Sequence, residues 1–176
     1  SGLSERSNRF IKLNDDDILI MEGIHGLNEK LTASIPKDYK FKIFVSALAQ
    51  LNIDDHNRIS TTDTRLVRRI VRDNQFRNFD AKSTINIWRT VLRGENNYIF
   101  PYQEEADMFF NSALVYEMSA LKQFALPLLF DISADNSEYT EANRLIRFMN
   151  SFLTVNTKYI PQNSILREFI GGSCFY

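Results

Sequence analysis

The chain has 176 residues, of which 44% are hydrophobic and 24% charged, and its net charge is −1. These values are typical of one globular domain with a substantial core, and they argue against general binding to nucleic acid or membrane surfaces. Cys174 is the single cysteine, which excludes an internal disulfide and favours a reducing, cytoplasmic setting. The longest apolar run, residues 124–130, contains Pro127 and is too short to cross a bilayer.

Residues 17–23, DILIMEG, are predicted to form the first strand. The polar residues 1–9 before it are expected to be an internal segment of a longer sequence and not a natural start. The apolar run from Ile18 to Met21 is too short for a helix and favours a strand buried on both faces of a parallel sheet. Glu22 then lies at the carboxyl edge, where open α/β sheets bind ligands. It is either a Mg²⁺ ligand or a surface turn acid. His25 is more typical of a structural turn than of a catalyst.

The next segments predict a strand–helix–strand unit. Residues 28–35 form a short helix ended by Pro36, and residues 39–47, YKFKIFVSA, form a second strand. Two strands joined in this way are expected to pair in parallel with a right-handed crossover. The connector 48–60 contains the run Asp-Asp-His at residues 54–56. Adjacent acids do not share a face of regular structure, which argues against a metal site there.

Residues 61–80, TTDTRLVRRIVRDNQFRNFD, carry the strongest chemical pattern. On a helix with about 100° per residue, four apolar residues cover one face: Leu66, Val67, Ile70 and Val71. Four arginines share the other face: Arg65, Arg68, Arg69 and Arg72. Thr61, Thr62 and Asp63 are the N-cap candidates. The pattern breaks beyond Asp73, where Arg77 adds a fifth guanidinium.

A row of like charges is ordinarily a solvated helix face, and that is the alternative interpretation. The cluster contains no lysine, however, and the planar guanidinium suits bidentate binding of phosphate or carboxylate. Like charges three and four residues apart also destabilise a helix unless an anion compensates. Only Asp63 and Asp73 are acidic within the cluster, so its charge is incompletely neutralised. We therefore expect this helix to face a polyphosphate.

The region after the arginine motif alternates between loops and helices. Residues 74–82 are predicted to be a mobile cover over a site, and Ser83 is expected to cap a helix that continues through Trp88 toward Gly94. Three aromatic residues surround Pro101 in NNYIFPYQEE. They either pack against the core or stack on a base, and packing is the commoner role for aromatics beside a proline.

The remaining elements are short. Residues 106–110 predict a third strand, and residues 114–117 a fourth. Amphipathic helices are expected at residues 118–126 and 138–153, with Ser137 as a cap of the second. The tail contains a helical turn at residues 164–169 that Gly171 and Gly172 close.

Three of these segments together resemble the uridine kinase and phosphoribulokinase branch of the P-loop kinases: residues 18–24, KIFVSA, and DTRLVRRIVRD at residues 63–73. The segments EGIHGLN, LNIDDHNR, IFPYQEEADMFFNSALVYE and NSILREFIGGSCF are similar to a bacterial subgroup of uridine kinase-like nucleoside kinases. Full chains of that subgroup carry an N-terminal region similar to threonyl-tRNA synthetase. The resemblance covers residues 10–174.

This resemblance implies an α/β fold, a partial P-loop kinase-like three-layer sandwich with a short, mostly parallel sheet and flanking helices. Residues 1–176 are then one domain, with a lid at 74–82 and a C-terminal helical part at 118–176.

The resemblance also implies residue roles. Glu22 corresponds to the acid that helps organise Mg²⁺, and Arg69 to the arginine that reaches the nucleoside and the phosphates. Arg72 corresponds to the arginine facing the ATP phosphates, and Arg77 to a lid arginine that closes over the triphosphate. The expected cofactors are ATP and Mg²⁺, and the acceptor is a nucleoside hydroxyl. In this chemistry the protein mainly positions the groups and neutralises charge.

Two departures from the family pattern concern the nucleoside. Phe79 stands where members with pyrimidine nucleoside specificity place a further arginine, and Asn86 and Ile87 stand near the position of an expected glutamine. The identity of the nucleoside is therefore open. A phosphoribulokinase-like or pantothenate-type hydroxyl substrate is the alternative within the kinase class.

A third departure is the absence of Gly-x-x-x-x-Gly-Lys-Ser/Thr from the 176 residues. That loop supplies the backbone amides that hold the β- and γ-phosphates. We expect this chain to be the C-terminal part of a larger kinase, inactive alone, with exposed strand edges that favour self-association. The alternative from another class is a non-catalytic anion-binding or interaction module.

Overall fold

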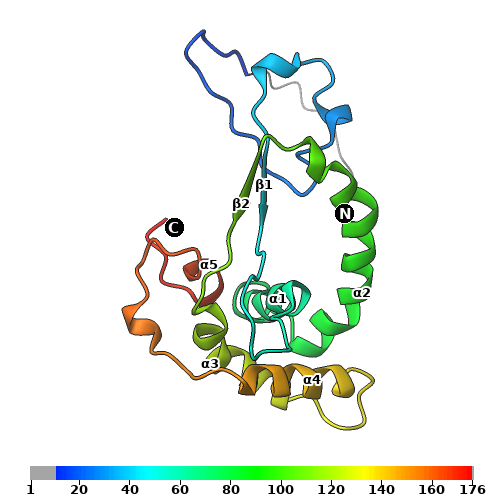
Figure 1. The fold of residues 1–176 in the computed structure, drawn as a ribbon, viewed down its shortest axis with the longest axis vertical. Coiled ribbons are helices and arrows are strands. Elements are labelled where there is room, and N and C mark those ends of the chain that lie inside the picture. The colour runs from blue at the N-terminus through cyan, green and yellow to red at the C-terminus, as the bar shows by residue number, and fades with distance from the viewer. Residues whose placement is uncertain (1–10, 176) are drawn as a thin grey trace.

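The computed structural model describes residues 11–175. The helices and strands are β1 (Ile43–Ser46), α1 (Thr61–Arg77), α2 (Ala81–Tyr98), β2 (Met108–Asn111), α3 (Glu117–Phe130), α4 (Tyr139–Asn150) and α5 (Arg167–Ile170). Short 3-10 helices lie at Glu29–Leu31, Lys37–Tyr39, Phe100–Glu105 and Thr157–Tyr159. Figure 1 shows the two strands between an upper region of N-terminal loops and a lower helical part, with α2 running beside them.

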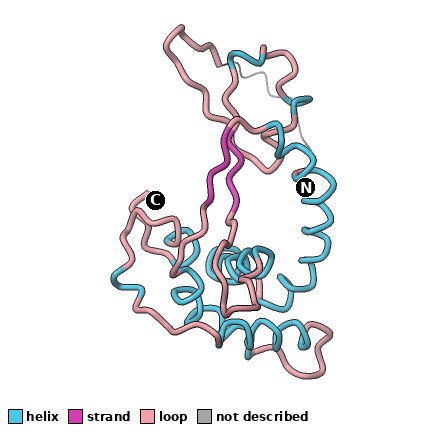
Figure 2. The backbone as a smooth tube through the Cα atoms, viewed as in Figure 1, coloured by secondary structure: helices cyan, strands magenta, loops and turns pink. Residues whose placement is uncertain are grey.

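The sheet consists of two parallel strands in the described part of the chain. Ile43 pairs with Met108 at one end and Ser46 with Asn111 at the other. The Asn111 side chain extends the pairing, because it accepts from Leu48 N and donates to Leu48 O, both at 2.9 Å. The helices α1 and α2 form the crossover between the strands (Figure 2). The structure therefore confirms that strands form within the predicted regions 39–47 and 106–110. Each observed strand is shorter than the predicted one.

Helix α1 is the central element of the helical part. Its predicted apolar face is confirmed, since Leu66, Val67, Ile70 and Val71 are all buried. The predicted cap is wrong: the Ser60 hydroxyl accepts from Asp63 N at 3.2 Å. The helix ends at Arg77, where Asn78 takes a left-handed conformation with φ of 55°.

One hydrophobic core surrounds α1. Figure 1 shows α3 and α4 below α1 and α5 to its side. The most buried large apolar members are Leu66, Ile70, Leu121, Leu129, Leu145, Met149 and Leu166. The predicted tail is confirmed, since α5 ends at Ile170 and is followed by Gly171 and Gly172, both with positive φ. This packing fixes the orientation of the arginine-bearing side of α1.

Two predicted strands are wrong. Residues 17–23 form no strand, and Ile18 and Ile20 are 88% and 87% exposed. A strand is stabilised by a ladder partner and by burial, and this segment has neither among the described residues. Consequently the parallel pairing predicted with residues 39–47 does not form. Residues 114–117 instead make the turn that leads into α3.

Several predicted boundaries also shift. The helix predicted at 28–35 reduces to the 3-10 turn Glu29–Leu31. Asp80, not Ser83, caps α2 and accepts from Ser83 N at 2.7 Å. Residues 74–77 belong to α1, so only residues 78–80 of the predicted cover are a loop. Within the described residues, no helix combines the length and apolar character needed to cross a membrane.

Candidate functional site

A cavity of about 300 Å³ lies where the carboxyl end of β1 meets α1, and we call it the arginine cavity. Its polar lining residues are Arg65, Arg68, Arg69, Arg72, Glu95, Glu168, Ser46 and Ser112. Its apolar lining includes Phe44, Trp88, Ile99, Phe100 and Phe169. The volume is at the lower end of the range for ligand sites, and the carboxyl ends of parallel strands are where open α/β sheets bind ligands.

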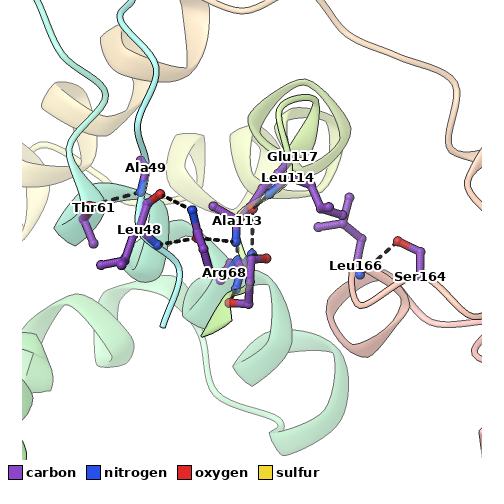
Figure 3. Close-up of polar contacts among 11 residues, drawn as sticks. Leu48, Ala49, Thr61, Arg68, Ala113, Leu114, Glu117, Ser164 and Leu166 are labelled. Carbon is purple, nitrogen blue, oxygen red and sulfur yellow. Dashed lines mark hydrogen bonds and ion pairs between the residues drawn. The ribbon is translucent and has the colours of Figure 1, made fainter. Parts of the chain in front are cut away.

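Arg68 is a buried structural member of the cavity wall. Its guanidinium forms a bidentate ion pair with the buried Glu117 carboxylate at the start of α3. It also donates to the Ser112 carbonyl at 2.7 Å and to the Ser112 hydroxyl at 3.1 Å. Glu117 in turn accepts from Leu114 N at 3.0 Å (Figure 3). With these donors occupied, Arg68 ties α1 to α3 and to the residue that follows β2, and its charge is neutralised.

Arg65 is paired as well. It makes a bidentate ion pair with Glu95 of α2, whose side chain is 7% exposed. Its guanidinium carbon lies 6.0 Å from the centre of the Trp88 ring, within the range of a cation–π contact. Arg65 and Glu95 therefore close the α2 side of the cavity as a neutral pair.

Arg69, Arg72 and Arg77 share a single carboxylate, that of Asp73. Arg72 Nη2 lies 3.1 Å from Asp73 Oδ1, and Arg77 Nη1 lies 3.3 Å from the same oxygen. Arg69 Nε lies 3.1 Å from Asp73 Oδ2, but the angle is not that of a hydrogen bond, so this buried nitrogen has no hydrogen-bond partner among the described residues. Three cations around one anion leave an excess positive charge on this part of α1.

The predicted arginine face is thus divided by the structure. Arg65 and Arg68 are neutralised by Glu95 and Glu117, which lie 30 and 49 residues away in sequence. Arg69 and Arg72 line the cavity with partial compensation, and their side chains are each 24% exposed. Arg77 lies outside the lining and is 54% exposed. The expectation that five arginines point at an anion is therefore too broad, and two of them remain as cavity donors.

Glu22 lies outside the cavity lining, on an exposed loop, while Ile24 two residues later lines the cavity. The described residues contain no group of three or more His, Cys, Asp or Glu side chains that could hold a metal ion. The Asp54 carboxylate accepts from His56 N and Asn57 N, both at 2.8 Å, which organises a turn. Its pKa is lowered, chiefly by the Asn57 side-chain hydrogen bond.

The lining residues that were not singled out from the sequence as members of the site include Ser112 and three others that matter for its chemistry: Glu95, Glu168 and Phe169. Glu95 is near the end of α2, and Glu168 and Phe169 belong to α5, about 100 residues from the arginine motif. Glu95 does fall on the α2 face that carries Trp88, which is the one sequence signal that could have indicated it.

A sequence model described as the phosphoribulokinase / uridine kinase family matches residues 4–119, about two thirds of the chain. The match includes both strands, the arginine motif and α2. Neither the curated proteins nor the solved structures gave a match. The arginine cavity at the carboxyl end of a parallel sheet is consistent with phosphate chemistry. The chain belongs to the phosphoribulokinase / uridine kinase family.

Proposed function

We propose that this chain forms the phosphate- and acceptor-binding part of an ATP-dependent nucleoside kinase of the uridine kinase-like type. The family supports phosphoryl transfer from ATP in general. The single observation that carries the proposal is that Arg69 and Arg72, only partly neutralised by Asp73, line a cavity with an aromatic wall. Guanidinium groups suit phosphate oxygens, and the apolar wall suits a base or sugar face.

The proposed roles follow the order of the residues along α1. Arg69 contacts both the nucleoside and the phosphate in this proposal. It lines the cavity, and its buried Nε–H donates no hydrogen bond to any described residue. Arg72, one turn nearer the end of the helix, faces the ATP phosphates. Arg77 closes over the triphosphate from the end of α1, where its exposed pair with Asp73 is weak enough to exchange. The protein thereby positions the groups and neutralises charge.

Mg²⁺ is the metal that this family implies, and Glu22 is its proposed ligand. Mg²⁺ in kinases keeps several waters and binds one or two carboxylates together with substrate phosphates. The Glu22 side chain is exposed and makes no ion pair with the described residues, so its carboxylate is available as one such ligand. When bound, the ion neutralises charge on the transferring phosphoryl group.

In this proposal, residues 1–176 form a single C-terminal part of the kinase domain, working in the cytoplasm. The bacterial subgroup with a threonyl-tRNA synthetase-like N-terminal region is the proposed origin, because segments such as EGIHGLN and LNIDDHNR resemble it. No Gly-x-x-x-x-Gly-Lys-Ser/Thr occurs in the 176 residues, so we propose that this chain alone transfers no phosphate.

A non-catalytic anion-binding module is the second candidate. The observation that favours it is the position of Glu22 outside the cavity lining. A substrate screen separates the two. The full-length protein is incubated with ATP, Mg²⁺ and a panel of nucleosides, with ribulose 5-phosphate and pantothenate as the other hydroxyl acceptors. ATP-dependent phosphorylation of a nucleoside supports the kinase, and triphosphate binding without turnover on any acceptor supports the module.

We also propose self-association of this chain. Ile43 and Val45 on β1 and Met108, Phe109 and Phe110 on β2 are each about half exposed. Exposed apolar strands with free edges are sites of pairing between chains. Sedimentation of the 176-residue chain should show dimers or larger species, and a monodisperse monomer would contradict the proposal.

A further inference from the structure

The C-terminal helix α5 (Arg167–Ile170) contributes a carboxylate to the arginine cavity. Glu168 and Phe169 both line the cavity, although they lie outside the residues 4–119 that match the family. Phe169 is buried, and the Arg68 guanidinium carbon lies 5.1 Å from the centre of its ring. The end of the chain is therefore a wall of the site.

Helix α5 is held firmly against α1. Arg167 donates to the carbonyls of Thr157, at 3.0 Å, and of Ile160, and thereby fixes the turn before it. Gly171 has φ of +82°, and a Cβ there would lie only 2.8 Å from Gln75 Nε2. Arg68 contacts Phe169, and Gln75 lies beside Gly171. Helix α5 therefore packs along the side of α1 that carries Arg68 and Gln75, and Arg72 lies between them on that side.

Glu168 differs from the other acid in the cavity. The Glu95 carboxylate is occupied by its bidentate pair with Arg65. The Glu168 backbone N–H donates to Ile165 O within the helical turn, but the Glu168 carboxylate makes no hydrogen bond or ion pair with any described residue. The oxygens of this carboxylate are therefore available to accept hydrogen bonds from a ligand, in a cavity that four arginines also line. A carboxylate repels phosphate, so the part of a ligand beside it must offer hydrogen-bond donors instead.

We propose that Glu168 is a specificity-determining residue that accepts hydrogen bonds from the vicinal hydroxyls of the nucleoside sugar. This inference rests on the proposed function. Two carboxylate oxygens match two neighbouring hydroxyl donors, and a carboxylate is a common partner for ribose hydroxyls in α/β nucleotide sites. Its charge also orients the ligand, because phosphate is favoured at Arg69 and Arg72 and disfavoured at Glu168.

The test compares a ribonucleoside with its 2′,3′-dideoxy analogue as acceptors for the full-length protein. Both keep the 5′-hydroxyl, and only the first has the diol. The wild type should prefer the ribonucleoside in kcat/KM. Glu168→Gln should lower kcat/KM for the ribonucleoside about 10- to 100-fold, mostly through KM, and should leave the dideoxy analogue unchanged.

Two controls separate recognition from structural damage. Asp131→Asn removes the same charge from an exposed side chain at the end of α3 and should leave both kcat/KM values unchanged. Inorganic triphosphate should bind Glu168→Gln at least as tightly as the wild type, because a repulsive charge is lost. Weaker triphosphate binding would indicate a damaged cavity and would overturn the inference.

Different results would overturn the role of Glu168 and the proposed kinase function. An active wild type whose diol preference persists in Glu168→Gln would overturn the role of Glu168 and leave the kinase intact. An active wild type without any diol preference would do the same. A full-length protein that phosphorylates no nucleoside would overturn the proposed function and this inference together.

Discussion

Arg77 Nη1 lies 3.3 Å from Asp73 Oδ1, one turn back along α1. The carboxylate is buried and also holds Arg69 and Arg72, while the Arg77 side chain is 54% exposed. An ion pair with so exposed a partner contributes at most about 1 kcal/mol, so a polyphosphate can displace it. Asp73 thus holds Arg77 at the end of α1 without fixing it there.

Removal of Arg77 should therefore affect turnover more than folding. In the full-length protein, Arg77→Ala is expected to lower kcat by at least about tenfold, because a cation closing over the triphosphate stabilises the transferring phosphoryl group. The unfolding free energy should change by less than about 1 kcal/mol. Arg93→Ala on α2, an arginine outside the cavity lining, is the matched control. An unchanged kcat would remove Arg77 from the site.

The pair of Arg68 and Glu117 should dominate the stability of the cavity wall. Glu117→Gln leaves a buried guanidinium without its counter-ion, which is expected to cost about 3–5 kcal/mol. Urea unfolding of the variant measures this loss. Glu104→Gln, at an exposed position, should stay within about 0.5 kcal/mol of the wild type. Equal midpoints for the two variants would show that the pair contributes little.

Gly94 and Gly171 should respond to alanine in opposite directions. Gly94 lies inside α2 with open space where a Cβ would be added, so Gly94→Ala should stabilise the chain by about 0.5–1 kcal/mol. At Gly171 the positive φ and the close Gln75 side chain should make Gly171→Ala destabilising by about 1–2 kcal/mol. Thermal unfolding of both variants checks the signs, and a shift in the same direction for both would contradict this account.

Glu29 should show an acid-dependent contribution to stability. Its pKa falls from 4.5 to about 2, because Lys40 and then Lys42 donate hydrogen bonds to the carboxylate. A depressed folded-state pKa stabilises the fold above pH 4.5, and this contribution declines as the pH falls from 4.5 toward 2. The difference in unfolding free energy between wild type and Glu29→Gln should follow that profile. A difference that stays constant across this acid range would refute it.

Local patterns in the sequence were sufficient to predict the parts of α1 that depend on its own residues. The apolar spacing of Leu66 and Ile70 identified the buried face, because helix periodicity is a local property. The strand at residues 39–47 and the glycine-closed tail were predicted for similar reasons. The caps were harder to place, since Ser60 and Asp80 each lie close to another good capping residue.

The partners of Arg65 and Arg68 could not be predicted, because both depend on tertiary packing. Glu117 reaches Arg68 from 49 positions away, and Phe169 comes from a helix near the end of the chain. The apolar run from Ile18 to Met21 was wrongly predicted to be a strand, also because local sequence does not specify tertiary partners. Its composition favours a strand, but a strand requires a neighbour to pair with, and composition does not supply one.

Binding of a polyphosphate by Arg69 and Arg72 can be measured by titrating the chain with inorganic triphosphate. The signal is the fluorescence of Trp88, the single tryptophan, which lines the cavity. We expect saturable binding that weakens with salt. The affinity should fall at least about tenfold in Arg69→Ala and Arg72→Ala, but not in Arg93→Ala. Equal affinities in all four proteins, or no binding to the wild type, would contradict it.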